Sequence, residues 1–358
     1  MRIQARQLKG FIKQIFIAAG ANIDDATLAS EALIAADLRG VDSHGVARLS
    51  GYIRLWQQKR LNMNAKVKVV HETPSTAVLD GDKGAGLIVA QKAMEIATSK
   101  AKTAGTGWVA IKNSNHFGIA GYHAMLALKH NMIGISMTNA SALVAPTYSR
   151  DRMLGTNPIA VAIPAGKEAP FVMDMATTPA ANGKLEVAER ENKNIPEGWA
   201  QTKEGHSSTS SRTLKEGGAM LPLGSDREHG SHKGYCLGAW VDIFSAVLSG
   251  ANYGPWVPPF VSFLEPPSNP VGDGIGHFIG AMRVDAFRPQ EEFEKHMDNW
   301  INSFRLAQSI EGMPAIEIPG DQERRFESER TNNGIPIHPT VIYDLNQLAN
   351  ELNIKPVI

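Results

Sequence analysis

The segment Asp42–Arg48 places an acid, a hydroxyl, an imidazole and a guanidinium within seven residues, at the expected start of a helix. Arg48 could hold a carboxylate through two parallel hydrogen bonds, while His44 donates a hydrogen bond to another substrate oxygen. The following helix places Arg48 and Tyr52 four residues apart, on one face. This pattern predicts a binding site for a small carboxylic acid. The alternative is that the acid or the hydroxyl only caps the helix and the imidazole lies in solvent.

A second histidine, His116, lies in the segment Ser114–Gly118, where a predicted strand at 108–112 gives way to a predicted helix. Sites in α/β sheets gather at the carboxyl ends of strands. The positive end of the helix dipole favours the neutral imidazole, which can accept a proton from an alcohol near pH 7. The competing interpretation is a structural histidine that donates to a backbone carbonyl.

Two further segments could contact a cofactor. Asp174 lies at the end of a predicted strand, where its carboxylate could bind a ribose or an amide, or could instead cap the next helix. Lys233 opens a long helix after a polar loop, a position where an ammonium could meet a phosphate or a ribose. A fully solvated lysine is the alternative there.

Two familiar kinds of site are not predicted. The glycine-rich stretch Gly272–Gly276 follows a proline-rich loop and leads into a strand, so the Rossmann fingerprint is absent. No HExxH pattern or close carboxylate accompanies the histidines, and we therefore predict no catalytic metal. The histidines considered are His44, His116, His123, His229 and His232.

Composition limits the class of protein. The 358 residues are 43% hydrophobic and 20% charged, which allows a sizeable core and excludes wholesale disorder. Basic and acidic residues number 36 each, so no net charge favours nucleic acid or an anionic membrane as a partner. One cysteine, Cys236, excludes an internal disulfide framework and fits a reducing compartment. No apolar run approaches the roughly 18 residues of a membrane span. We expect a globular protein of the cytoplasm.

Hydrophobic spacing predicts a helical start followed by an α/β body. Asp24 or Asp25 is expected to cap the second helix, while Gly20 and Gly40 end the first two. Residues 189–232 are polar and weakly periodic, which predicts a long surface excursion. The predicted helices span 3–19, 26–39, 48–58, 86–104, 118–131, 235–249, 289–307, 321–332 and 339–352. The predicted strands span 66–71, 77–80, 108–112, 133–138, 159–163, 171–174 and 278–284.

Several segments together resemble one family. They are DSHGVAR (42–48), SNHFGIAGYHA (114–124), LGTNPIAVAIP (154–164), FVMDMAT (171–177), LPLGS (221–225), HKGY (232–235) and IPGDQE (318–323). The chain resembles the malate/L-lactate dehydrogenase family of the second type, which includes ureidoglycolate, L-sulfolactate and 2,3-diketo-L-gulonate oxidoreductases. The resemblance implies an α/β fold with a mixed sheet and a non-Rossmann cofactor-binding domain. The expected division is a helical domain of residues 1–65 with 314–358, and an α/β domain of residues 66–313.

The resemblance also implies roles for particular residues. His116 matches the proton-transfer histidine, and His44 matches a second active-site histidine that has been proposed as the acid in some members. The resemblance therefore leaves open which of the two transfers the proton. Arg48 matches the substrate carboxylate site, with Ser43 and Tyr52 beside it. Ala140 stands where some members have serine, and Asp321 where members often carry Glu or His. The expected cofactor contacts are Asn139, Ala140, Thr156, Asp174, Met175, Ala176, Lys233, Gly320, Asp321 and Gln322.

The expected activity is therefore interconversion of a small 2-hydroxy acid and its 2-oxo acid, with malate or lactate first. The expected cofactor is NAD, with NADP as the alternative, and the expected assembly is a homodimer. The same fold with a ureidoglycolate, sulfolactate or diketogulonate-type substrate is a second hypothesis. A binding protein that keeps the fold without turnover is a third.

Overall fold

The computed structural model describes residues 1–356, so the last two residues of the predicted helical domain lie outside the described part. No helix within residues 1–356 is long and apolar enough to cross a membrane. The α-helices are α1 (Ala5–Ala18), α2 (Ile23–Leu38), α3 (Leu49–Gln57), α4 (Gly86–Ala104), α5 (Ala120–Met125), α6 (Asn182–Arg190), α7 (Ser231–Asp242), α8 (Gln290–Arg305), α9 (Asp321–Asn333) and α10 (Pro339–Glu351).

A seven-stranded mixed sheet forms the centre of the molecule, in the order β2-β3-β4-β11-β5-β6-β7. Only β3 and β4 run parallel, and α4 makes the crossover between them; every other neighbouring pair is antiparallel. The predicted mixed α/β fold is confirmed. The strands of this sheet are β2 (Lys68–Glu72), β3 (Thr76–Gly84), β4 (Thr106–Ser114), β5 (Met132–Thr138), β6 (Ile159–Ile163), β7 (Phe171–Met175) and β11 (Ile275–Arg283).

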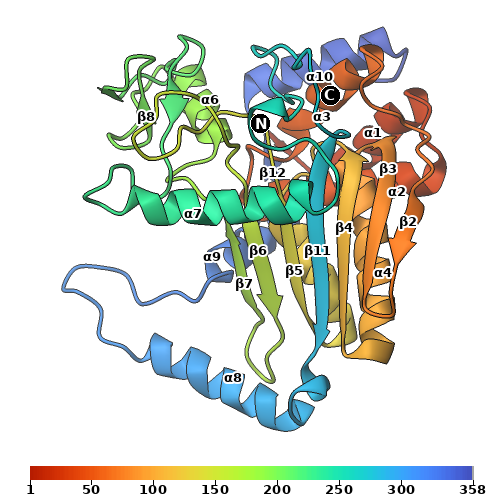
Figure 1. The fold of residues 1–358 in the computed structure, drawn as a ribbon, viewed down its shortest axis with the longest axis vertical. Coiled ribbons are helices and arrows are strands. Elements are labelled where there is room, and N and C mark those ends of the chain that lie inside the picture. Colours follow the sequence, from red (N-terminus) through yellow and green to blue (C-terminus); the bar gives the residue numbers. More distant parts are fainter. Residues whose placement is uncertain (357–358) are drawn as a thin grey trace.

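Helices cover the sheet unequally. Helix α4 packs behind β3, β4 and β11, and α5 continues the same layer behind β5 and β6. Helix α7 crosses the other face, and its π-helical continuation, Ile243–Val247, packs on β4 and β11 (Figure 1). Helix α8 lies at the far end of the strands, and residues 306–317 then run away from the body. These residues are called the arm below.

The two ends of the chain share one apolar core. Buried residues of α1, α2 and α3 pack with Leu345 and Leu348 of α10, and β1 (Arg2–Ile3) pairs with β12 (Ile335–Pro336). The helix α1 buries one face at helical spacing and ends before Gly20, whose φ is +99°. Helix α3 packs in this core, and the turn before α3 carries the motif Asp42–Arg48. The core therefore helps to position that motif.

Three helices differ from their prediction, either in the residue that caps them or in where they begin and end. Helix α2 is capped by Asn22, whose Oδ1 accepts the Asp25 N–H at 2.9 Å, so the predicted cap at Asp24 or Asp25 was wrong. The Asp25 carboxylate binds Lys92 instead, at 2.7 Å. The single helix predicted for 118–131 is α5 followed by a 3₁₀ turn, Leu126–His130. The helix predicted for 235–249 begins earlier, at Ser231.

The predicted surface excursion is partly ordered secondary structure. Residues 189–232 hold a small antiparallel sheet of β8 (Ala200–Gln201), β9 (Ser207–Ser208) and β10 (Ala219–Met220). Its strands are two residues long, too short to give a period that the sequence could show. The sheet rests on a separate apolar cluster that includes Leu185 and Leu214.

Candidate functional site

The two predicted histidines meet at the centre of the site. The rings of His44 and His116 stack with centroids 5.7 Å apart and planes 21° apart. His44 follows the end of α2, and His116 follows the carboxyl end of β4. The Ser43 hydroxyl lies 2.8 Å from His44 Nδ1. The fold therefore brings the segments Asp42–Arg48 and Ser114–Gly118 together, as a shared site requires.

Two aromatic side chains hold His116 in place. Tyr52 is fully buried, and its hydroxyl lies 2.7 Å from His116 Nδ1. The Phe260 ring stacks on His116 with centroids 4.4 Å apart, and the Phe260 N–H donates to Ser141 Oγ. The predicted Tyr52 therefore contacts the histidine rather than the cavity described below. Burial raises the pKa of Tyr52 well above its usual 10, so the hydroxyl keeps its proton.

Both stacked imidazoles are neutral at physiological pH. Burial lowers the pKa of His44 to about 3, with a further contribution from the nearby Arg48 charge. Burial also lowers the pKa of His116 well below 6.5, and the His44 and Arg48 charges act in the same direction. Because two adjacent imidazolium rings repel each other, protonation of one ring disfavours protonation of the other. A neutral imidazole here can accept a proton from a substrate.

The buried side chain of Asp37 holds the turn that carries His44. The Asp37 carboxylate accepts the Val46 N–H at 2.8 Å. Gly45 lies so close that a Cβ at this position would stand 1.9 Å from Asp37 Oδ1, so only glycine fits. Arg330 of α9, also buried, donates to the Asp37 carbonyl and to the Asp42 carboxylate. Burial raises the pKa of Asp37 to about 8.

Arg48 points to the end of α6. Its Nε donates to the Ser43 carbonyl at 2.6 Å, and its Nη2 lies 2.9 Å from Glu186 Oε2. Arg48 lines a hollow of about 370 Å³, which is called the arginine hollow below. Its other walls include Arg54, Glu186, Arg190 and Phe260. The predicted carboxylate-binding residue is therefore paired with an internal carboxylate.

A second cavity, of about 390 Å³, lies beside His44. It is called the histidine cavity below. Its size and its mixture of apolar walls with a few polar groups are typical of small-molecule sites. The lining includes the predicted residues Ser43, His44, Thr156, Asp174, Met175 and Ala176, together with Arg39, Ile119, Pro158, Lys184, Leu223 and Glu323.

Asp174 is the main acidic group of the histidine cavity. Its Oδ2 accepts the Gly121 N–H at 2.7 Å, and a Cβ on Gly121 would lie 2.7 Å from this oxygen. Burial raises the pKa of Asp174 to about 6, while the Gly121 hydrogen bond and the Arg39 charge oppose the shift. The carboxylate is thus held in place with acceptor capacity left for a ligand.

The match to known proteins decides the family. A family model described as "Malate/L-lactate dehydrogenase" matches residues 3–346. The chain belongs to the malate/L-lactate dehydrogenase family. The resemblance inferred from the motifs is confirmed, and the enzyme class follows from it.

Members of this family cover the chain almost completely. The malate dehydrogenase of Pyrococcus abyssi is 42% identical over 356 residues, 99% of this chain and 96% of that protein. The L-sulfolactate dehydrogenase of Methanocaldococcus jannaschii is 36% identical over 333 residues, 93% of this chain and 92% of that protein. A more distant relative, 28% identical over 337 residues, is named ureidoglycolate dehydrogenase (NAD(+)), from Escherichia coli O157:H7; the match covers 94% of this chain and 93% of that protein.

The fold agrees with solved structures of the family. The malate dehydrogenase of Pyrococcus horikoshii OT3 superposes with a TM-score of 0.90 at 37% identity, over 99% of this chain and 97% of that chain. The structure also agrees with the absence of a Rossmann glycine loop, because Gly272–Gly274 leads into strand β11 and not into a helix. The central sheet of this family member is therefore not a Rossmann sheet.

Two residues expected to contact the cofactor, Asn139 and Ala140, make hydrogen bonds within the protein instead. Asn139 is buried, and its amide binds Asp242, the Asn252 carbonyl and the Gly276 N–H at 2.8–3.0 Å. The Ala140 N–H donates to Asn157 Oδ1 at 3.1 Å. Neither residue is part of the histidine cavity lining. Asn139 thus joins the end of β5 to α7 and to the start of β11.

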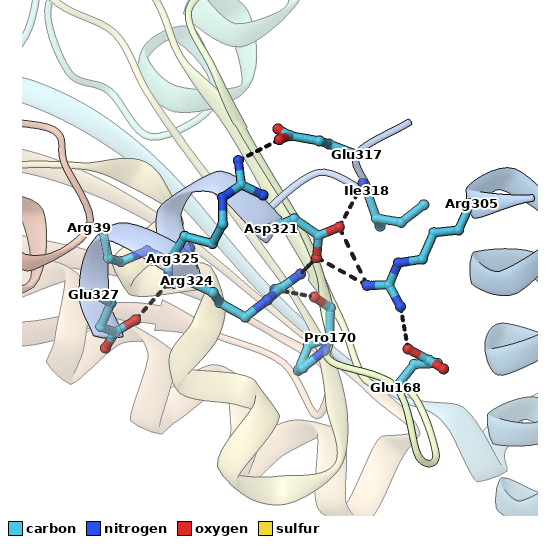
Figure 2. A network of polar contacts seen from close by, with 10 residues as sticks. All are labelled: Arg39, Glu168, Pro170, Arg305, Glu317, Ile318, Asp321, Arg324, Arg325 and Glu327. Carbon is cyan, nitrogen blue, oxygen red and sulfur yellow. Dashed lines mark hydrogen bonds and ion pairs between the residues drawn. The ribbon is translucent and has the colours of Figure 1, made fainter. Parts of the chain in front are cut away.

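The expected C-terminal loop lies in an ion-pair network. The Asp321 carboxylate binds Arg305 at 3.1 Å, Arg324 at 2.5 Å and the Ile318 N–H at 2.9 Å (Figure 2). Although burial opposes the shift, these groups hold the pKa of Asp321 below its usual value. Gly320 precedes α9 with a φ of +99°, and Gln322 is exposed. The loop reaches the histidine cavity through its next residue, Glu323.

Lys233 lies exposed in the first turn of α7 and is not part of the histidine cavity lining. The nearest predicted segment that does reach the cavity is LPLGS, through Leu223. Among residues 1–356, no group of three or more His, Cys, Asp or Glu side chains could hold a metal ion.

The structure adds four residues that the sequence did not single out. Arg39, Lys184 and Glu323 line the histidine cavity and carry most of its charge besides Asp174. His277 of β11 binds Ser114 Oγ at 2.8 Å and Thr138 Oγ1 at 2.7 Å, behind the His116 segment. Glu323 ends the quoted IPGDQE motif, and Lys184 follows a glycine in the first turn of α6. Arg39 and His277 carry no local signal, because they reach the site through tertiary packing.

Proposed function

We propose that the chain is a dehydrogenase that uses NAD or NADP to interconvert a small 2-hydroxy acid and its 2-oxo acid, with malate as the first substrate to test. The observation that carries this proposal is the stacked pair of neutral imidazoles beside Arg48. This combination provides a proton acceptor and, from the neighbouring arginine hollow, a cation for a carboxylate.

The residues divide the chemistry between binding and proton transfer. Arg48 holds the substrate carboxylate, which orients the hydroxyl-bearing carbon toward the histidines. One imidazole of the pair accepts the hydroxyl proton, and in the reverse direction the same imidazole returns it. Tyr52 and Phe260 keep His116 oriented throughout. When bound, the nicotinamide cofactor supplies the hydride acceptor for the substrate carbon.

The histidine cavity fits such a cofactor. Its apolar walls suit a flat ring, and the Asp174 carboxylate can accept hydrogen bonds from ribose hydroxyls. Arg39 and Lys184 provide positive charge for a diphosphate. Thr156, Met175 and Ala176 complete the predicted cofactor contacts in this cavity. We propose NAD first, because Asp174 and Glu323 add negative charge that opposes the additional phosphate of NADP.

Malate is favoured over other 2-hydroxy acids by the name of the 42% identical relative. The 36% identical relative is named for L-sulfolactate, which has a sulfonate where malate has its second carboxylate. Both substrates carry two negative charges, so sulfolactate is the second candidate. A binding protein without turnover would not need two neutral imidazoles held at the site.

A direct assay tests the proposal. The purified protein is incubated with NADH or NADPH and a panel of 2-oxo acids that includes oxaloacetate, pyruvate and sulfopyruvate, and nucleotide absorbance is followed. We expect oxidation of NADH with oxaloacetate. Failure to oxidise either nucleotide with any 2-oxo acid would contradict the proposed function and favour the binding protein.

We also propose that two copies of the chain form a homodimer. The arm exposes Leu306, Ile310 and Met313 to the extent of 83%, 77% and 64% of their surfaces. Exposed apolar residues concentrated on one segment are typical of an interface. A second copy is the proposed occupant because most soluble oligomers are symmetric assemblies of one chain.

We propose the cytoplasm as the location of the protein. Cys236 is the only cysteine of the chain, so the fold requires no oxidising compartment. Fractionation of cells that produce the protein would test this location.

A further inference from the structure

The N-terminal half of α6 packs against Arg48. Glu186 Oε2 stands 2.9 Å from Arg48 Nη2, and both side chains are largely buried. A Cβ added to Gly183 would stand 2.4 Å from Ser43 Cβ and 2.9 Å from Arg48 Nη2. Glycine at 183 thus allows the helix to approach the guanidinium closely enough for the ion pair.

This ion pair places a carboxylate where the proposed function needs one from the substrate. Arg48 lines the arginine hollow but not the histidine cavity, whereas α6 contributes walls to both. Lys184 lines the histidine cavity, and Glu186 lines the arginine hollow. Helix α6 therefore lies beside both Arg48 and the histidine cavity.

We propose that the Glu186 carboxylate occupies the carboxylate position on Arg48 in the free enzyme and competes with the substrate for it. A 2-hydroxy acid binds by exchanging its own carboxylate for that of Glu186. This inference rests on the proposed role of Arg48 as the group that holds the substrate carboxylate. The exchange makes affinity depend on how well the substrate carboxylate competes with an internal one.

The groups around Glu186 keep the free-energy cost of the exchange low. Arg190, one turn later on α6, lies 3.8 Å from the same Glu186 oxygen. Asn182 Nδ2 donates to the other Glu186 oxygen at 2.8 Å. Once released, Glu186 keeps a cation and a hydrogen-bond donor on its own helix. Arg48 exchanges one carboxylate for another, so the net charge of the pair is unchanged.

The test compares two variants at helix α6, each of which replaces one glutamate carboxylate by a neutral amide. Glu186→Gln keeps the size of the side chain and removes the competing charge. We expect its KM for malate to fall about two- to fivefold, the change that corresponds to a partly exposed ion pair, with kcat unchanged. Calorimetric titration of malate into the enzyme with cofactor present should show the same gain in affinity.

Glu191→Gln is the matched control. Glu191 directly follows α6 and pairs with Lys193 at 2.7 Å, so this variant removes the same charge at a residue that does not line the arginine hollow. Its KM should stay at the value of the unaltered enzyme. An equal fall in both variants would mean a general effect of charge and would overturn the proposal.

A KM that is unchanged or raised in Glu186→Gln would also overturn it, because Glu186 would then orient Arg48 rather than compete for it. Failure of the proposed function looks different. In that case the unaltered enzyme neither turns over nor binds a 2-hydroxy acid. The proposed competition between Glu186 and a substrate carboxylate is then also wrong. Turnover by the unaltered enzyme, combined with no change in Glu186→Gln, removes this inference alone.

Discussion

At the scale of single residues, the site depends on keeping two imidazoles neutral in close contact. His44 lines the histidine cavity, and His116 stacks on both His44 and Phe260. The burial that lowers their pKa values is provided by side chains from three separate segments. The same burial makes each ring available as a proton acceptor at neutral pH.

Replacing His116 by asparagine tests which ring moves the proton. Asparagine can still accept the Tyr52 hydrogen bond but cannot exchange a proton, so we expect kcat to fall by about 10²- to 10⁴-fold with cofactor affinity kept. Steady-state kinetics and nucleotide binding measure the two quantities. Turnover close to that of the unaltered enzyme would assign proton transfer to His44, and His44→Asn would then show the loss.

Replacing Arg48 by lysine tests the carboxylate site. Lysine keeps the charge but cannot make two parallel hydrogen bonds. We expect kcat/KM for malate to fall about 10- to 100-fold, the effect of losing a hydrogen bond to a charged group. Thermal melting serves as the control for folding. An unaltered kcat/KM with both malate and lactate would remove Arg48 from the substrate site.

At the scale of elements, the end of α2 sets the position of the catalytic turn. The Asp37 carboxyl lies under Gly45 and accepts the Val46 N–H, while α9 contributes Arg330 from below. Gly45 and Val46, which contact Asp37, directly follow His44 in the chain. A helix end, a tight turn and a distant helix therefore position one imidazole.

Asp37 should also make stability depend on pH. Its pKa is raised from 3.8 to about 8 in the folded protein, so the folded state binds a proton that the unfolded state releases between these values. The stabilisation from that proton is complete below about pH 4 and is lost as the pH rises through 8. The loss is on the order of 1 kcal/mol per pH unit.

Asp37→Asn provides the comparison, because an asparagine oxygen can still accept the Val46 N–H. We expect the Tm of the unaltered protein to fall relative to that of the variant between pH 5 and pH 8. Melting curves at three pH values measure the difference. Parallel curves for the two proteins would show that Asp37 is ionised in the folded state.

The elements also show what the sequence can and cannot predict. Helix α4 begins and ends where predicted, because apolar spacing and a terminal glycine are local signals. The site motifs are local too, and six predicted residues line the histidine cavity. The Arg330–Asp37 contact spans 293 residues, and the Glu186–Arg48 pair depends on packing of α6; neither leaves a local signal. The interior roles of Asn139 and Asp321 were hidden for the same reason.

At the scale of the whole molecule, one apolar core joins the two ends of the chain, while the arm contributes nothing to it. The core cluster of α1, α2, α3 and α10 also takes in Leu87 and Phe260 from the α/β body. The predicted division into two domains stays a prediction, but the shared core explains how the C-terminal helices reach the catalytic turn. The base of the arm is closed by Arg305, which binds both Glu168 and Asp321 (Figure 2).

The arm provides the test of assembly. Arg305 and Asp321 anchor its two ends, yet its apolar side chains face solvent in a single chain, which a second subunit would correct. We expect light scattering at micromolar concentration to give about 77 kDa, twice the 38.7 kDa of one chain. Ile310→Glu should shift the mass toward one chain without lowering the Tm of the monomer, because Ile310 is 77% exposed. Ser303→Glu, on the exposed end of α8, is the control for added charge. A fully active species of about 39 kDa in the unaltered protein would show that the site is complete in one chain and that the arm has another partner.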